Sequence, residues 1–311
     1  MLDLLKFRIT DEVLINTVWN NELLEYVGKS ERLYIDEIKE KQTKKYKNLY
    51  FVKNQYHIEI SGSIHYFYND GLHNADDFYI EYCISAINQI KNLFNLDLNK
   101  CKIINLEYGV NINPIINVTD LVHNIIYHST RQFVRTTTHN DFKQAGNEAY
   151  KQIKAYNKSV QFPHECENTF RIEVRTREHK FLKKLGIVSL QDLVEISSYD
   201  KLITSLLNEW DNVLLFDLSK DIDTKFFNTH FWEDIIKKAK EKINRNKFNN
   251  QKKLYYKKLG ADNLHANIRK IIERRTKYLK CVHIPTITKV ETAQVRIKFS
   301  ECDYILKKKI Q

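Results

Sequence analysis

Hydrophobic and polar positions alternate with a period of two along several short stretches of the first 186 residues, which is typical of half-buried strands. This alternation predicts strands over residues 2–9, 48–69, 100–112, 150–162 and 168–177, with a turn near Gly62 inside the second. Apolar residues at helical spacing predict helices over residues 76–96, 118–128 and 180–186, the last ended by Gly186. The mixture predicts an α+β fold: an antiparallel-type sheet with helices on one face and the other face open.

From Ile187 onward the pattern becomes helical. The spacing predicts helices over residues 189–196, 199–210, 231–243, 251–260 and 264–279, and a strand over residues 293–306. We therefore expect two parts, a sheet domain over residues 1–186 and a mainly helical region over residues 187–311.

Charge separates these two parts further. The chain carries a net charge of +11, yet residues 235–311 hold 22 Lys and Arg against 6 Asp and Glu, leaving 28 basic and 33 acidic residues elsewhere. A strongly basic C-terminal third favours a polyanionic partner, most simply nucleic acid, over a merely solvated set of lysine-rich helices. Five cations crowd one predicted helix and are expected to contact DNA phosphates: Arg269, Lys270, Arg274, Arg275 and Lys277.

The chain shows no apolar run long enough to span a membrane and no signal peptide at its start, so we expect a soluble protein of the cytoplasm. Its five cysteines are widely spaced and include no Cys-x-x-Cys pair. This spacing favours reduced thiols over a disulfide framework or a zinc cluster.

Three of the predicted strands have polar faces that carry chemically useful groups. Lys154, Tyr156 and Lys158 share one strand face, because alternate residues of a strand point to the same side. On the other two strands the polar faces carry Asn105, Glu107, Gly109 and Asn111, and Arg171, Glu173, Arg175 and Arg177. If the three strands are neighbours, the uncovered face of the sheet gathers a tyrosine, two carboxylates and several cations.

Such a face suits phosphoryl transfer by a tyrosine. A free phenol has a pKa of about 10 and is a poor nucleophile at neutral pH. Lys154 and Lys158 would favour the ionised form of Tyr156. Glu107 and Glu173 would hold a divalent cation, and oxygen ligands indicate Mg²⁺ or Mn²⁺ rather than zinc.

At these residues the chain resembles rolling-circle replication initiators, in particular the gene II replication proteins of filamentous phages and related plasmid initiators. MLDLLKFRI, INLEYGVNI, IKAYNKS and TFRIEVRTREHKFLKKLGI resemble successive segments of that family, in its order, over about residues 1–190. The resemblance implies a site-specific DNA nickase and strand transferase that forms a 5′-phosphotyrosyl link. It also implies a replication origin, single-stranded or extruded as a hairpin, as substrate, and a host helicase and polymerase as partners.

The resemblance assigns roles to individual residues. Tyr156 would be the nucleophile and Lys158 the lysine that follows it, while Glu107 and Glu173 would correspond to the acids beside the metal. Lys154, Arg171 and Arg175 would contact DNA. The chain departs from many such nickases because no two of its 11 histidines stand two residues apart, so it lacks a His-x-His pair of metal ligands. His57 or His65 is an alternative source of a ligand.

Two other functions remain open. A non-catalytic DNA-binding protein, such as an origin-binding protein or repressor, would share the basic C-terminal region. An RNA-binding sheet would instead need aromatic side chains on the open face, where these strands present charges.

Overall fold

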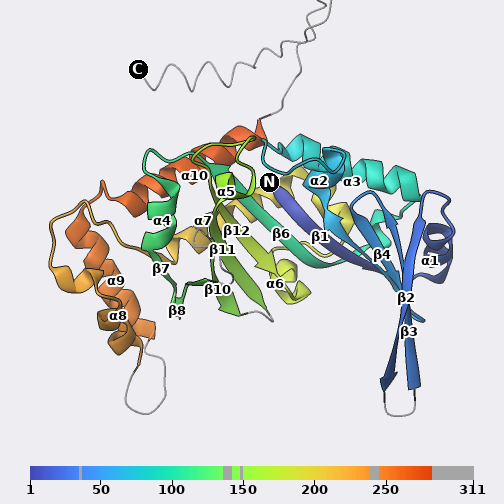
Figure 1. Cartoon of the computed structure of the whole chain (residues 1–311), viewed down its shortest axis with the longest axis horizontal. Coiled ribbons are helices and arrows are strands. Elements are labelled where there is room, and N and C mark those ends of the chain that lie inside the picture. Colours follow the sequence, from blue (N-terminus) through green and yellow to red (C-terminus); the bar gives the residue numbers. More distant parts are fainter. Residues whose placement is uncertain (35–36, 136–141, 148–149, 238–244, 282–311) are drawn as a thin grey trace, which may run out of the picture.

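The fold is α+β with a large antiparallel sheet, as the sequence predicts (Figure 1). The computed structural model describes residues 1–34, 37–135, 142–147, 150–237 and 245–281. Within these residues, ten strands form one sheet in the order β2-β3-β4-β5-β1-β6-β12-β11-β10-β9. Their bounds are β1 (Leu2–Ile9), β2 (Glu25–Tyr34), β3 (Glu37–Tyr46), β4 (Leu49–Lys53), β5 (Ile58–Ser63), β6 (Lys102–Ile112), β9 (Val134–Arg135), β10 (Phe142–Asn147), β11 (Lys151–Asn157) and β12 (Phe170–Thr176).

A smaller sheet and the helices complete the described part of the chain. The small sheet has the order β13-β7-β8, with bounds β7 (Ile125–His128), β8 (Arg131–Gln132) and β13 (Val213–Leu215). The α-helices are α1 (Glu12–Trp19), α2 (Ile64–Tyr68), α3 (Ile80–Phe94), α4 (Val118–Asn124), α5 (Lys158–Gln161), α6 (His179–Lys184), α7 (Ile196–Asp211), α8 (Thr229–Ile236), α9 (Arg245–Leu259) and α10 (Leu264–Lys280). Short 3₁₀ turns are Leu98–Lys100, Leu190–Val194 and Thr224–Phe227.

A layer of helices that includes α7 and α10 covers one face of the large sheet and buries its apolar side chains (Figure 1). Tyr108 of β6 reaches into this layer, where its hydroxyl lies 2.8 Å from Ser205 Oγ of α7. Phe170 of β12 packs edge-on against Trp210, with ring centroids 6.1 Å apart. Each such buried apolar side chain stabilises the fold by roughly 1.5–3 kcal/mol. The alternate residues of β6, β11 and β12 must therefore point to the opposite face.

A second, separate core lies under α8 and α9. Trp232, Phe248 and Tyr255 are fully buried there and pack against the small sheet.

The two-part division after residue 186 stays a prediction about domains. In the structure, α7 and α10 belong to the second part of the sequence but pack into the core of the large sheet.

The predicted turn near Gly62 is wrong. The chain turns at residues 54–57 instead, because the side chain of Asn54 accepts hydrogen bonds from the backbone N–H groups of Tyr56 and His57. Gly62 lies within β5, where an added Cβ would come within 2.6 Å of a backbone oxygen. The strand then ends because the Ser63 side chain accepts the N–H of Tyr66 and begins α2.

Other differences concern where the predicted elements end and which elements were not predicted. The predicted helix over residues 118–128 ends at Asn124, and the chain continues as β7. The predicted strand over residues 150–162 ends at Asn157, whose side chain caps α5. Elements not predicted include α1, the strands β8, β9 and β10, and the β2–β3 hairpin, which projects from the sheet (Figure 1). The predicted strand over residues 293–306 lies outside the described residues.

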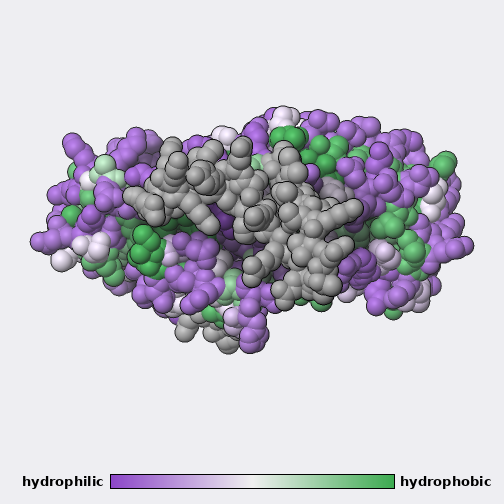
Figure 2. Space-filling view, turned by 90° about the horizontal axis from the view of Figure 1, so that it is seen from above, coloured by the Kyte–Doolittle hydropathy of each residue, from purple (hydrophilic) through white to green (hydrophobic). Residues whose placement is uncertain are grey.

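The surface and the thiols agree with the composition. Seen from above, hydrophilic residues dominate the described surface, with smaller hydrophobic patches between them (Figure 2). Among the helices of the described ranges, none has the length and apolar content that a membrane span needs. Cys83, Cys101, Cys166 and Cys281 are free thiols, as predicted, and Cys302 lies outside the described residues.

Candidate functional site

The register of three neighbouring strands brings the predicted polar residues together. Glu173 of β12 stands between Lys154 of β11 and Gly109 of β6, and Arg175 lies opposite Glu107. Side chains on one face of adjacent antiparallel strands lie close enough to interact. Gly109 has a specific reason to be glycine, because a Cβ there would approach the Ile172 carbonyl oxygen to 2.2 Å. The sequence alternation thus correctly predicted that Glu107, Glu173 and Lys154 share one face.

A third carboxylate, which the sequence analysis missed, joins the two predicted ones. Asp3 of β1 contributes an oxygen that lies within 4.8 Å of oxygens from Glu107 and Glu173. All three residues are buried. The position of Asp3 depends on a register shift between β1 and β6, between Leu2 and Leu5. Simple alternation along β1 does not show such a shift.

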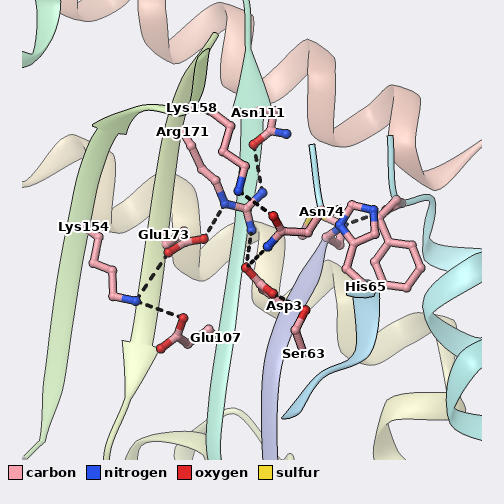
Figure 3. A network of polar contacts seen from close by, with 12 residues as sticks. Asp3, Ser63, His65, Asn74, Glu107, Asn111, Lys154, Lys158, Arg171 and Glu173 are labelled. Atoms are coloured by element: carbon pink, nitrogen blue, oxygen red, sulfur yellow. Dashed lines mark hydrogen bonds and ion pairs between the residues drawn. The ribbon is translucent and has the colours of Figure 1, made fainter. Parts of the chain in front are cut away.

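Three cations surround these acids, and two of them, Lys154 and Arg171, are labelled in Figure 3. Lys154 Nζ lies 2.9 Å from Glu107 Oε2 and 3.6 Å from Glu173 Oε2, so it bridges the two predicted metal ligands. The Arg171 guanidinium forms an ion pair with the Glu173 carboxylate and lies 3.4 Å from Asp3 Oδ2. A third ion pair joins the Arg175 Nε atom to Glu107 Oε1 at 2.8 Å. Each of the three acids therefore has a basic partner at this site.

The two glutamates differ in their acidity. Two effects raise the pKa of Glu107: burial is the larger, and the negative charge of Glu173 is the second. They outweigh the positive charges of Lys154 and Arg175, which act to lower this pKa. Burial alone would also raise the pKa of Glu173, but the charges of Arg171 and Lys154 outweigh it and lower this pKa to about 2. Glu173 is therefore ionised at neutral pH and accepts hydrogen bonds.

Tyr156 points into this group of charges. Its hydroxyl donates a 3.0 Å hydrogen bond to Glu173 Oε1, and the residue is only 9% exposed. Burial, and then the negative charge of Glu173, raise the pKa of the phenol well above its usual value. The expectation that Lys154 and Lys158 favour the ionised phenol is therefore wrong for the structure as it stands. The carboxylate is closer to the phenol and burial disfavours its charged form.

Lys158 does not lie on the strand face as predicted. It is the first residue of α5 and is fully buried, with its Nζ atom 2.7 Å from Asn74 Oδ1 and 3.0 Å from Gln161 Oε1. The ammonium also lies 5.8 Å from the centre of the Tyr156 ring. Burial, and then the charge of Arg171, lower the pKa of Lys158 to about 8. Its hydrogen bonds go to Asn74 and Gln161.

Part of the predicted open face is covered by a distant segment of the chain. The segment that follows α2 places Asn74 against Asp3, with its Nδ2 atom 3.0 Å from Asp3 Oδ2 (Figure 3). The same segment accepts a hydrogen bond from Asn111 Nδ2 through the backbone oxygen of Ala75, at 3.0 Å. Asn74 therefore links the acid on β1 to Lys158.

The two histidines considered as metal ligands have other partners. His65 is buried, stacks on Phe78 and lies 2.7 Å from Asp76. His57 packs beside Asn54 at the turn before β5 and lies 3.6 Å from Glu59. Neither belongs to the carboxylate group found among the described residues.

The five predicted cations of α10 fall into two sets. Arg269 pairs with Asp211, Arg275 pairs with Asp77, and Lys277 pairs with Glu273, so these three are partly neutralised within the chain. The other two are exposed and form no ion pair with an acid of the described chain: Lys270 and Arg274.

The acid group has the chemistry of a site for a hard divalent cation. Opposite ligands of Mg²⁺ lie about 4.2 Å apart, since each Mg–O distance is about 2.1 Å. The oxygens of Asp3, Glu107 and Glu173, within 4.8 Å of one another, approach this spacing without backbone movement. Carboxylate oxygens alone favour Mg²⁺ or Mn²⁺ over zinc. The three acids therefore fit the predicted metal.

Comparisons with known proteins add a likeness to a solved structure. No protein-family model matches the chain, and no curated protein matches it. One similar solved structure is a rolling circle replication initiator protein from Geobacillus stearothermophilus, with 13% sequence identity and a TM-score of 0.44. The match covers 75% of this chain and 93% of that chain. At this level of similarity the function of the present chain has to be argued from its own residues.

Proposed function

We propose that this chain is a replication initiator that nicks single-stranded or extruded origin DNA with Tyr156. The observation that carries the proposal is the hydrogen bond from the Tyr156 hydroxyl to Glu173, at the edge of a group of three carboxylates. A nucleophile next to an acceptor and a cation site is the arrangement that phosphoryl transfer needs. The family resemblance of the Tyr156 segment supports the same assignment.

The proposed reaction is a transesterification. The Tyr156 oxygen attacks a DNA phosphorus and the bond from phosphorus to the 3′ oxygen breaks. The 3′ oxygen leaves and takes a proton from water to become a hydroxyl. Glu173 accepts the hydrogen bond of the phenol, so it is placed to receive the proton as the new bond forms. The product carries the 5′ phosphate on Tyr156, and attack by a 3′ hydroxyl reverses the step and joins strands.

Asp3, Glu107 and Glu173 would hold the metal. A Mg²⁺ or Mn²⁺ ion bound there would polarise the phosphate and offset the negative charge that raises the pKa of Tyr156. Lys154, Arg171 and Arg175 would contact the phosphates on either side of the nick, and the cations of α10 would contact DNA further away. Strand separation and synthesis would need a host helicase and polymerase in the bacterial cytoplasm.

The test uses a pool of random single-stranded oligonucleotides labelled at one end, with Mn²⁺, followed by a denaturing gel. A 3′ label should become covalently attached to the protein and a 5′ label should not, because the tyrosine keeps the 5′ phosphate of the downstream piece. EDTA and Tyr156→Phe should each abolish the adduct. Tyr66→Phe is the matched control, since Tyr66 is a half-buried tyrosine near Asp3.

One observation favours a second function, a non-catalytic DNA-binding protein. The phenol of Tyr156 is buried, and its pKa is raised rather than lowered. Salt-dependent DNA binding with no adduct from either label, under Mg²⁺ or Mn²⁺, would support this function and reject the nickase.

A further inference from the structure

A polar cavity lies between the small sheet and the far end of the β10–β11 hairpin, at the start of α9. Its volume is about 450 Å³, which is within the range of small-ligand pockets. Elements from distant parts of the chain meet there: β7, β8, β11 and α9 (Figure 1). The lining residues that matter for its chemistry are His128, Ser129, Arg131, Lys151, Arg245 and Asn249.

A buried acid lies behind one wall of the cavity, and its carboxylate already has hydrogen-bond partners within the chain. Glu209 of α7, 6% exposed, accepts from Lys151 and lies 2.9 Å from His128 Nε2. Burial alone would raise the pKa of Glu209, but hydrogen bonding to His128 and the charge of Lys151 outweigh it and lower the pKa. This arrangement fixes the orientation of Lys151 and His128 at the wall.

Two arginines leave the cavity with an excess of positive charge. The Arg131 side chain donates a hydrogen bond to the backbone oxygen of Gly146, at 3.3 Å, and Arg245 is exposed. Neither forms an ion pair with an acid in the part of the chain that the structure describes. With Lys151 balanced by Glu209, the cavity keeps the charges of both arginines, and the hydroxyl of Ser129 and the amide of Asn249 add further donors.

The cavity is distinct from the tyrosine site. Lys151 and Ile153 point to the helix-covered face of β11, whereas Lys154 and Tyr156 point to the polar face. Lys151 and Tyr156 are five positions apart on β11, or about 17 Å along the strand. A ligand in the cavity therefore does not touch the three carboxylates.

We propose that this cavity binds a phosphate group through Arg131, Arg245 and Lys151. Arginine forks and a lysine held by a buried carboxylate are suited to the oxygens of a phosphate. Two arginine charges without an acid partner among the described residues match its dianion. The phosphate is carried by a nucleic-acid strand or is free in solution, and the two sources share this chemistry. The site goes beyond the proposed nicking reaction and stands whether or not Tyr156 forms an adduct.

The test measures binding to the full-length protein by calorimetry in about 0.15 M salt, where charges more than about 8 Å apart are largely screened. The probes are inorganic phosphate, thymidine monophosphate and a twelve-residue oligothymidylate. Arg245→Ala removes a pocket charge, and Lys253→Ala removes an exposed charge from the same helix outside the pocket. Both side chains are exposed, so the thermal midpoints of both variants should match the parent protein.

The expected result is that Arg245→Ala weakens phosphate binding at least tenfold while Lys253→Ala changes it less than twofold. If the oligothymidylate shows the same difference between the variants, the phosphate is that of a strand. If only the two small probes show it, the ligand is free phosphate or a mononucleotide. Equal losses in both variants, or no phosphate binding by the parent protein, would overturn the proposal.

Discussion

Replacing Lys154 with methionine should increase the affinity of the protein for Mn²⁺ in the absence of DNA. Lys154 bridges Glu107 and Glu173 with its ammonium 2.9 and 3.6 Å from their oxygens, so it occupies the space beside the proposed metal ligands. Methionine has a similar volume and shape but no charge. The variant therefore removes a competing cation without opening a large cavity.

The size of the effect follows from Coulomb's law. Two unit charges about 4 Å apart interact by about 4 kcal/mol at an effective dielectric constant of about 20. The Lys154 side chain is 13% exposed and can swing toward solvent when a metal arrives, so only part of this repulsion is retained. If about a third is retained, the gain is about 1.4 kcal/mol, or a tenfold lower Kd for Mn²⁺.

Electron paramagnetic resonance of free Mn²⁺ measures this Kd without any reaction. Lys91→Met is the matched control, because Lys91 is exposed on α3 and lies outside the acid group. Without metal, Lys154→Met should also lower the unfolding free energy by about 1–3 kcal/mol, since two buried carboxylates lose a partner. Added Mn²⁺ should restore it. Equal Kd values in the variant and parent protein would refute the competition between lysine and metal.

Three further outcomes test other parts of the structure. Gly109→Ala should lower the unfolding free energy by about 3 kcal/mol or more, because the new Cβ would lie 2.2 Å from a backbone oxygen. The control is Gly28→Ala, whose new Cβ has no atom within 4 Å and which should change the unfolding free energy little. Urea denaturation measures both. Lys158 has a folded pKa of about 8 and a usual value of 10.5, so the unfolded chain binds its proton more tightly. The parent protein should therefore gain stability as the pH rises from about 8 to about 10.5, and Lys158→Met should lack this part of the gain. Removing Lys270 or Arg274 should reduce the salt slope of DNA binding by about 1 each, and an unchanged slope would remove these residues from the interface.

Strand alternation was sufficient to place the predicted tyrosine and glutamates on one face. These three residues lie on strands in which polar and apolar residues alternate and which pair without a register shift: Tyr156, Glu107 and Glu173. The period of two in the sequence was therefore enough to predict which face each side chain is on. Asp3 was missed because its position depends on an irregular pairing between β1 and β6. Such irregularities arise from the packing of distant strands and leave no periodic signal.

The electrostatics of the tyrosine were not predictable from neighbours in sequence. Two lysines at positions i−2 and i+2 suggested a lowered phenol pKa, yet one of them starts a helix and the other binds glutamates. Asn74, far away in the chain, covers part of the same face and contacts both Asp3 and Lys158. The sign of a pKa shift depends on these tertiary contacts rather than on local spacing.

The central claim is that the Tyr156 oxygen becomes bonded to a DNA phosphate. Peptide mapping of the 3′-labelled adduct tests it most directly, because trypsin cleaves after Lys154 and Lys158 and releases residues 155–158 as one short peptide with a single tyrosine. We predict that mass spectrometry finds the nucleotide on this peptide. A nucleotide on any other tyrosine-containing peptide, or protein that binds DNA with Mn²⁺ and stays unmodified, would contradict the claim.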